Sequence, residues 1–357
     1  MTRPHALSAD GITASSDIVV RMPSEDILQI VSLFSGAGGL DFATELAGRI
    51  STLARLELQP EYCDTIRRSE ESGLLSKAPL FAEDIRTVAV EDVLAERRAG
   101  LPLGVIGGPP CETFSSMGRK RGLSDPRGML VMSFADFVDK SDADFFVLEN
   151  VPALARMSDG AILKELLERF EEQGFAVAFN VLRASDFGAA TSRRRLFIVG
   201  IRGGPSFEFP AATHAEEPGR SLKPWVSVGL ALAGLPSPSD AGPGVPTGHV
   251  RIHHRPAVIE RFATVPSGGY DYVRKRSRLA LDRPSVSLVA GDLNGTRSHI
   301  HPIEDRELTN RECARIQGFP DNYEFAGSRM AVAKQIANAV PVPLGTAIMM
   351  ALLDRVW

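Results

Sequence analysis

Between residues 29 and 200 the chain alternates short apolar runs with segments of helical period, and this alternation limits the possible folds most strongly. Residues 29–34 (QIVSLF) are predicted to form the first strand. Later strands are predicted to end at residues 56–58, 80–81, 105–106, 145–148 and 196–199. Helical periodicity covers residues 90–98, 129–139 and 162–173. Strands that alternate with helices predict an α/β fold with a mostly parallel sheet and helices on both faces.

The character of the sequence changes after Gly203. Residues 205–248 are dense in proline, glycine and serine, and residues 250–279 are basic and contain histidines. Helical patterns return at residues 310–316 and 330–353. A compact α/β block, an irregular insert and a returning helical tail suggest a cleft between two domains.

Three segments are therefore expected along the chain. Residues 1–28 are predicted to be a loosely ordered amino-terminal segment, since their first part is polar and aperiodic. Residues 29–203 together with 330–357 are predicted to form the larger domain. Residues 204–329 are predicted to form the smaller, irregular domain.

Composition excludes several classes of protein. The chain is 44% hydrophobic and 24% charged, which is ordinary for a globular protein, and its net charge of −4 argues against a uniformly basic nucleic-acid binder. The three cysteines form no CxxC pair, which fits a reducing cytosol and gives no support to a disulfide framework or zinc finger. No stretch reads as long and apolar enough to span a bilayer, and the amino terminus lacks a signal-peptide profile. We expect a cytoplasmic protein with no membrane partner.

A rigid turn at residues 107–111 (GGPPC) follows the apolar run 103–106. Two glycines and two prolines force a sharp exit from the predicted strand and present Cys111 at its carboxyl end, where open α/β sheets bind ligands. A lone cysteine is more often a small buried hydrophobe. The proline-fixed turn and the motifs below favour a nucleophile instead.

A second set of residues predicts a cofactor site. Residues 34–40 (FSGAGGL) join the first strand to a helix, and their glycines allow close backbone approach while the helix amino terminus offers N–H groups. Glu57 follows about twenty residues later, where a carboxylate can hold two ribose hydroxyls. Asp84 and Ile85 follow the third strand and could accept an adenine amino hydrogen and cover the ring. Each residue alone is more often a turn or a solvated loop, but together they favour an adenosine-type cofactor. The turn lacks a Walker lysine, which argues against nucleoside triphosphate hydrolysis.

Two further motifs lie at the same predicted edge of the sheet, where the strands end. Glu149 and Asn150 end the apolar run 145–148, which brings a carboxylate to the edge where Cys111 lies. Taken alone, this pair could equally cap a helix or form a salt bridge. Arg193 and Arg195 alternate before the last strand and therefore point to one side of an extended chain. A charge run is usually a solvated face, but alternate arginines here could bind phosphate or steady a reacting group.

With these motifs in this order, the chain resembles the C5 cytosine-specific DNA methyltransferases. The resemblance runs from about Ile30 to the carboxyl terminus and is weakest between residues 205 and 248. Its motifs are FSGAGG, GGPPC, Glu-Asn-Val, Arg-Arg-Arg, and the segments 310–320 and 335–340. The resemblance implies a class I, Rossmann-like fold dependent on S-adenosylmethionine, with residues 204–329 as a target-recognition domain.

The resemblance also implies a reaction. The Cys111 thiolate would add to C6 of a flipped-out cytosine, and Glu149 would hydrogen-bond N3 and the exocyclic amine. C5 would then take the methyl group, leaving S-adenosylhomocysteine. Arg195, with Arg193 beside it, would orient the ring and Glu149. The loop 115–126 would close over the base.

The remaining implied site residues fall into two groups. The cofactor pocket would be lined by Phe34, Gly36, Gly38, Gly39, Glu57, Asp84, Ile85, Pro109 and Asn338. DNA contacts are expected from Ser115, Arg119, Lys120, Arg251, Arg274 and Arg276. Basic residues outnumber acidic ones around the last three, although generic surface charge is the alternative reading. No metal is expected, because His299 and His301 have no third ligand nearby.

The chain departs from the family pattern at two places. Glu112 replaces a common glutamine after the cysteine, which puts an acid near the DNA. Residues 188–191 (GAAT) replace a common Gly-Val-Pro-Gln, which puts a glutamine support of the arginines in doubt. Neither change removes a reacting group.

The expected partner is double-stranded DNA, with a cognate restriction endonuclease as a possible genetic partner. We expect a monomer, since one asymmetric cleft suffices to flip one base. Two alternatives remain: a tRNA cytosine-5 methyltransferase, and a catalytically silent DNA-binding relative.

Overall fold

A seven-stranded sheet forms the larger part of the computed structural model, which describes residues 25–110, 129–239, 246–273, 275–288 and 299–356. The spatial order of the strands is β3 (Leu80–Phe81), β2 (Ile50–Leu56), β1 (Leu28–Leu33), β4 (Leu103–Gly107), β5 (Phe145–Asn150), β7 (Arg194–Arg202) and β6 (Phe175–Arg183). The first five pair in parallel, whereas β7 is antiparallel to both of its neighbours. The α/β class with a mostly parallel sheet is thus confirmed.

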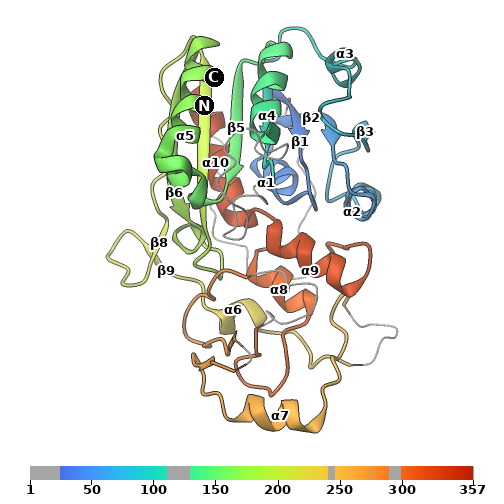
Figure 1. Cartoon of the computed structure of the whole chain (residues 1–357), viewed down its shortest axis with the longest axis vertical. Coiled ribbons are helices and arrows are strands. Elements are labelled where there is room, and N and C mark those ends of the chain that lie inside the picture. Colours follow the sequence, from blue (N-terminus) through green and yellow to red (C-terminus); the bar gives the residue numbers. More distant parts are fainter. Residues whose placement is uncertain (1–24, 111–128, 240–245, 274, 289–298, 357) are drawn as a thin grey trace, which may run out of the picture.

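Helices cover both faces of this sheet because its central strands are apolar on both sides; all six residues of β1 are buried. On one face, α4 (Met129–Lys140) and α5 (Ala161–Glu172) pack in one core cluster with β5, and the Phe170 ring stacks on Phe146 at 3.9 Å between centroids. On the other face, α1 (Gly39–Ala47) and α10 (Val342–Val356) contact each other and share a second cluster. Figure 1 shows these layers.

Three elements differ from the sequence-based expectation. Strand β6 was not predicted, because it is the edge strand and its residues are mostly half-buried or exposed rather than forming an apolar run. Helix α3 (Val90–Val93) is shorter than the predicted 90–98. The predicted helix 330–353 is two helices, α9 (Arg329–Asn338) and α10. Proline at position 341 favours extended backbone before it, which ends α9.

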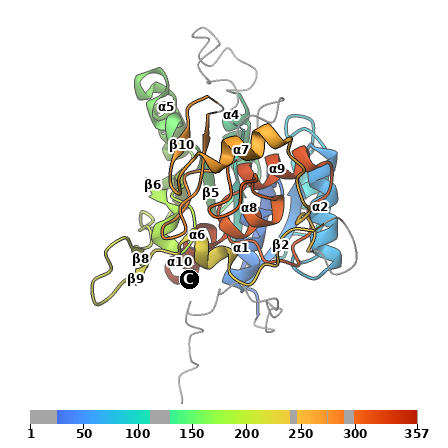
Figure 2. The ribbon, with the colours of Figure 1, turned by 90° about the horizontal axis from the view of Figure 1, so that it is seen from below.

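The remaining described elements are short. The chain between β2 and β7 also contains α2 (Pro60–Glu71) and the 3₁₀ helices η2 (Pro152–Gly160) and η3 (Ala184–Phe187). The smaller part lies below the sheet in Figure 1 and nearest the viewer in Figure 2. Its elements are α6 (Val228–Leu232), α7 (Pro256–Ala263), β10 (Tyr270–Asp271), β11 (Arg276–Ser277) and α8 (Asn310–Ile316). The short strands β8 (His214–Ala215) and β9 (Lys223–Pro224) lie beside β6, and β8 contacts η3.

The sequence predicted no segment long and apolar enough to span a membrane. By the criteria of length and composition alone, this prediction was wrong. The stretch Arg329–Asp354, which covers α9 and most of α10, passes that test. Most of its apolar window is buried, and α10 packs against α1 and η3. Core helices of globular proteins have the same apolar character.

Candidate active site

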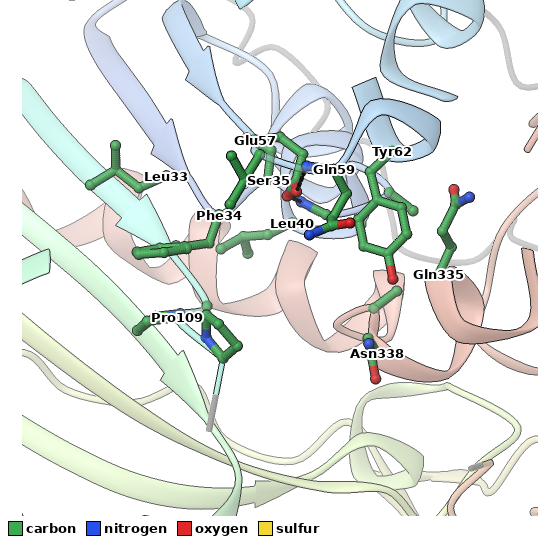
Figure 3. A pocket seen from close by; sticks show the side chains of 18 of the residues that line it. Leu33, Phe34, Ser35, Leu40, Glu57, Gln59, Tyr62, Pro109, Gln335 and Asn338 are labelled. Carbon is green, nitrogen blue, oxygen red and sulfur yellow. Dashed lines mark hydrogen bonds between the residues drawn. The ribbon is translucent and has the colours of Figure 1, made fainter. Parts of the chain in front are cut away.

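A cavity of about 930 Å³ opens at the carboxyl ends of β1, β2, β4 and β5. Its walls come from the turns that follow these strands, from the approach to β7, and from α9 with the residues around it. Figure 3 shows Phe34 and Pro109 on one side of this space, and Tyr62 and Asn338 on the other. No described residue between 204 and 327 lines it. The cavity therefore belongs to the larger part of the fold rather than to a boundary between two domains.

The glycine-rich turn after β1 shapes one end of the cavity. Phe34 and Gly36 both have left-handed backbone, with φ of 52° and 59°, and both line the cavity. Positive φ is unusual for a bulky residue such as phenylalanine, and strained backbone of this kind concentrates at functional sites. Gly39 also lines the cavity, and a Cβ there would lie 3.1 Å from the Val340 carbonyl oxygen.

Gly38 corrects the expected set of lining residues. It has φ of 74° at the start of α1 but does not line the cavity. A Cβ at this position would lie 2.7 Å from the Tyr323 hydroxyl oxygen. Gly38 therefore serves the turn and its packing, not the cavity wall.

Glu57 is fixed at the end of β2 by the backbone. Gly36 N donates to its Oε2 and Gln59 N donates to its Oε1, each at 2.8 Å. Burial raises the pKa of Glu57 above its ordinary value, although these N–H groups act in the opposite direction. The held carboxylate faces the cavity with lone pairs left to accept hydroxyl hydrogens.

Asp84 and Ile85 lie at the same end of the cavity. Arg86 donates to both carboxylate oxygens of Asp84, at 2.9 Å from Nε and 2.5 Å from Nη2. These hydrogen bonds lower the pKa of Asp84 to about 2, so the group is an anion at neutral pH. The structure thus gives Asp84 a partner that the sequence analysis did not include.

Two motifs far apart in the sequence meet at the other end. Asn150 Nδ2 donates to the Pro109 carbonyl oxygen at 3.0 Å, which ties the proline turn to the end of β5. Gly108 allows this approach, because a Cβ there would lie 2.7 Å from Glu149 Oε2. The glycine and the asparagine therefore fit the turn against the buried carboxylate.

Glu149 and Arg195 form an ion pair in the cavity wall. The distance between Arg195 Nε and Glu149 Oε1 is 2.6 Å, and both residues are buried. Burial raises the pKa of Glu149, while the Arg195 guanidinium counteracts part of this effect. The pair can hold a proton or a positive charge close to a ligand in the cavity.

Arg193 joins three parts of the structure. Its Nη1 donates to the Leu288 carbonyl oxygen at 3.1 Å, and its Nη2 to the Asn338 carbonyl oxygen at 3.4 Å. Thr191, at the position of the family glutamine, is fully buried and donates to the Val286 carbonyl oxygen at 3.3 Å. Arg193 is thus supported by the backbone carbonyl groups of Leu288 and of Asn338 in α9.

Several predicted residues lie outside the described part of the chain. These are Cys111, Ser115, Arg119, Lys120 and Arg274. Pro110, which directly precedes Cys111, lines the cavity.

The arginines expected to contact DNA are not equivalent. Arg251 is exposed, and its Nε donates to the Pro238 carbonyl oxygen at 3.2 Å. Arg276 pairs with Glu307, and its guanidinium lies 5.6 Å from the centroid of the Phe262 ring. A DNA contact by Arg276 stays a prediction, but this pairing removes the free charge on which it was based.

Further residues that were not predicted from the sequence line the cavity. They include Leu58, Gln59, Tyr62, Ser328, Lys334 and Gln335. Leu58 and Gln59 directly follow Glu57, and Tyr62 lies five residues after it, so their closeness in sequence to the predicted ribose-binding residue was an available signal. Lys334 lies one turn before Asn338 on α9, where helical spacing could have indicated the same face.

The residues at the first end of the cavity fit an adenosine-type ligand. The carboxylates of Glu57 and Asp84 can accept hydroxyl and amino hydrogens, and Phe34, Ile85 and Leu58 offer apolar surface for a ring.

The fold of the chain is similar to the folds of two proteins of known structure. The crystal structure of a putative DNA modification methyltransferase encoded within an E. coli prophage matches with a TM-score of 0.73 at 24% identity, covering 92% of this chain and 99% of that chain. The structure of the S. pombe Dnmt2 methyltransferase matches with a TM-score of 0.65 at 17% identity, covering 92% and 98%. At these identities the likeness shows the fold.

Sequence comparison identifies the family. The profile for C-5 cytosine-specific DNA methylases matches residues 28–225 and 260–354. The type II methyltransferase M1.HphI of Haemophilus parahaemolyticus is 33% identical over 91% of this chain and 87% of its own length. M.NgoFVII of Neisseria gonorrhoeae is 32% identical over 88% and 83%. The chain belongs to the C-5 cytosine-specific DNA methylase family, and its enzymatic class is DNA cytosine-5 methyltransferase, as the motifs predicted.

Proposed function

We propose that the chain transfers a methyl group from S-adenosylmethionine to C5 of a cytosine flipped out of duplex DNA. The observation that carries this proposal is the Glu149–Arg195 pair, which faces the same cavity as Pro110 and the glycine turn. A base that enters this space meets a buried acid at one end. The other end offers acceptors for an adenosine.

The cofactor would lie along the glycine turn. Glu57 would accept the ribose hydroxyls, Asp84 the adenine amino hydrogen, and Phe34 and Ile85 would contact the ring. Pro109, Gly36, Gly39 and Asn338 would complete the wall. When bound, S-adenosylmethionine supplies an electrophilic methyl group and leaves as S-adenosylhomocysteine.

The protein's own groups would prepare the cytosine. The Cys111 thiolate would add to C6, which makes C5 nucleophilic. Glu149 would hold a proton at N3, and its raised pKa supports this role because the protonated form persists at higher pH. Arg195 would keep the carboxyl in place, and Arg193 would hold the start of β7 against α9. Loss of the C5 proton and departure of the thiolate from C6 would then restore the aromatic ring.

The two parts of the chain would divide the work. Residues 29–203 with 330–357 would perform catalysis, and residues 204–329 would recognise the target sequence. The relatives named above are type II methyltransferases, so a cognate restriction endonuclease in a prokaryotic cytoplasm is the proposed setting. We propose that the monomer is the active form.

Labelled methyl transfer tests the proposal. Wild-type protein and Cys111→Ser would be incubated with labelled S-adenosylmethionine and unmethylated genomic DNA, and 5-methylcytosine positions would be sequenced. Label at one short motif, absent with Cys111→Ser, is the expected result. Label on tRNA but not on DNA would contradict the proposal that DNA is the substrate. No transfer, and no covalent complex with a duplex containing 5-fluorocytosine, would indicate a silent binding protein.

A further inference from the structure

The turn of the β10–β11 hairpin presents a group of exposed apolar side chains. Tyr272 is 84% exposed, Val273 is 72% exposed and Tyr270 is 44% exposed. The rings of Tyr270 and Tyr272 meet edge to face, with 5.0 Å between centroids. Single exposed apolar residues are ordinary, but three of them at one turn form a compact surface suited to contact with a ligand.

The base of the hairpin is braced, so this surface is held in a set orientation. The Asp271 carboxylate is almost fully buried and accepts from Arg261 of α7, at 2.7 Å from Nε and 2.5 Å from Nη2. The same carboxylate accepts from Val273 N at 2.9 Å. A turn fixed before binding loses less conformational entropy when it meets a partner.

The arginines that follow the turn point inward. Arg276 pairs with Glu307. Arg278 is 5% exposed and donates to the Phe262 carbonyl oxygen and to Asp305. Their charges stabilise the interior of the smaller part. Among the described residues of the hairpin, the exposed side chains at the turn are therefore Tyr270, Tyr272 and Val273, with Lys275 as the one exposed cation beside them.

The hairpin is connected directly to the wall of the cavity. Ser285 pairs with the chain before β7 through Ser192 N to Ser285 O and Ser285 N to Ala190 O, both at 2.8 Å. Three residues later, the Leu288 carbonyl oxygen accepts from Arg193 in the cavity wall. Extended chain from Ser277 to Ser285 spans at most about 29 Å. DNA rises about 3.4 Å per base pair, so this upper limit corresponds to about eight base pairs.

Charge around the hairpin favours DNA as the occupant. Lys275 is exposed beside the turn, and Arg251, Arg255 and Arg283 are exposed elsewhere in the smaller part. The exposed cations could contact the phosphates of the DNA backbone. The apolar side chains of the turn could contact base edges in the groove, where thymine carries a methyl group.

We propose that Tyr272 and Val273 read base edges in the major groove of duplex DNA by apolar contact, and so help to set the target sequence. This inference depends on the proposed function. It assigns sequence discrimination to two uncharged residues of the smaller part rather than to its arginines. Lys275 contributes affinity that is independent of sequence.

The test compares site preference among variants. Wild-type protein, the double variant Tyr272→Ser/Val273→Ser, Lys275→Ala and Phe179→Ala would methylate the same unmethylated genomic DNA, followed by sequencing of 5-methylcytosine. Phe179 is the matched control, because it is 49% exposed on β6, away from the smaller part. The KM for DNA, the KM for S-adenosylmethionine and the melting temperature would be measured alongside.

For the double variant we expect the preference for the best site over its single-base variants to fall roughly tenfold. The KM for DNA should rise, while the melting temperature and the KM for S-adenosylmethionine stay unchanged. Lys275→Ala should weaken all sites equally, and Phe179→Ala should match wild type. Unchanged site preference and KM for DNA in the double variant would overturn the inference, as would an equal loss in Phe179→Ala. Absence of methyl transfer by the wild type would instead contradict the proposed function.

Discussion

Arg195 Nε lies 2.6 Å from Glu149 Oε1, so one buried ion pair joins β5, which ends at the cavity, to β7, which begins there. The two residues belong to β7 and β5, which pair in antiparallel register directly beneath this contact. The sheet itself therefore sets the distance between acid and guanidinium. Substitution of Glu149 therefore tests directly whether this ion pair takes part in methyl transfer.

Glu149→Gln preserves the side-chain shape but removes the exchangeable proton and the charge. We expect the rate of methyl transfer to fall by about 10²–10⁴-fold with little change in the Kd for S-adenosylhomocysteine. Single-turnover kinetics and calorimetry measure the two quantities. Glu83→Gln is the control, because Glu83 lines the cavity but is exposed. Equal losses in both variants would argue against a special role for Glu149.

Gly108→Ala tests the contact between the proline turn and the acid. The added Cβ would lie 2.7 Å from Glu149 Oε2, and the carboxylate is held by Arg195, so the turn must shift. We expect kcat to fall at least tenfold, because small displacements of reacting groups are costly. Gly219→Ala should be neutral, since nothing lies within 4 Å of its Cβ position. Wild-type kcat in Gly108→Ala would show that the turn does not fix the reacting geometry.

Glu57→Ala removes the carboxylate that the Gly36 and Gln59 N–H groups hold in place. The affinity for S-adenosylhomocysteine should fall by roughly 10–100-fold, as expected for hydrogen bonds to a charged group. Calorimetric titration measures the change. Glu61→Gln, another acid of the cavity lining, should bind normally because Glu61 is exposed. Undiminished binding by Glu57→Ala would remove Glu57 from the cofactor site.

Arg55→Met should destabilise the fold by about 3–5 kcal/mol, because it leaves buried acids without their partner. Arg55 is fully buried, with Nε 2.9 Å from Asp41 Oδ1 and Nη1 2.7 Å from Glu70 Oε1. The free energy of unfolding in urea measures the loss. Arg67→Met, which breaks the exposed pair with Asp64, should change stability by less than about 1 kcal/mol. A small effect of Arg55→Met would contradict a need of Asp41 and Glu70 for this guanidinium.

His299 should make stability depend on pH. Burial lowers its pKa to about 4 from an ordinary value of 6.5. Between these values the unfolded chain binds a proton that the folded chain does not, so stability falls as the pH drops from 6.5 to about 4. The loss attributable to this group reaches about 3 kcal/mol.

His299→Gln should flatten this part of the profile relative to wild type. Urea midpoints at pH 7 and pH 5 give the comparison. Parallel profiles for wild type and His299→Gln would refute a buried, neutral His299.

The sequence by itself determined where the central strands lie along the chain, which turns follow them and to which family the chain belongs. These features are local: a buried parallel strand is an apolar run, and a proline-glycine turn has its own chemistry. The positions of Phe34, Glu57 and Pro109 along one cavity followed from the rule that parallel strands end at the same edge.

The tertiary structure alone decided which polar groups meet. The pairing of Glu149 with Arg195, the support of Arg193 by Leu288 and Asn338, and the inward turn of Arg276 all join residues distant in sequence. The edge strand β6 and the packing role of Gly38 depend on neighbours in the same way. An arginine has the same local signature whether it faces phosphate or a buried carboxylate. Only the long-range packing around it selects between the two, because burial requires that its charge be paired.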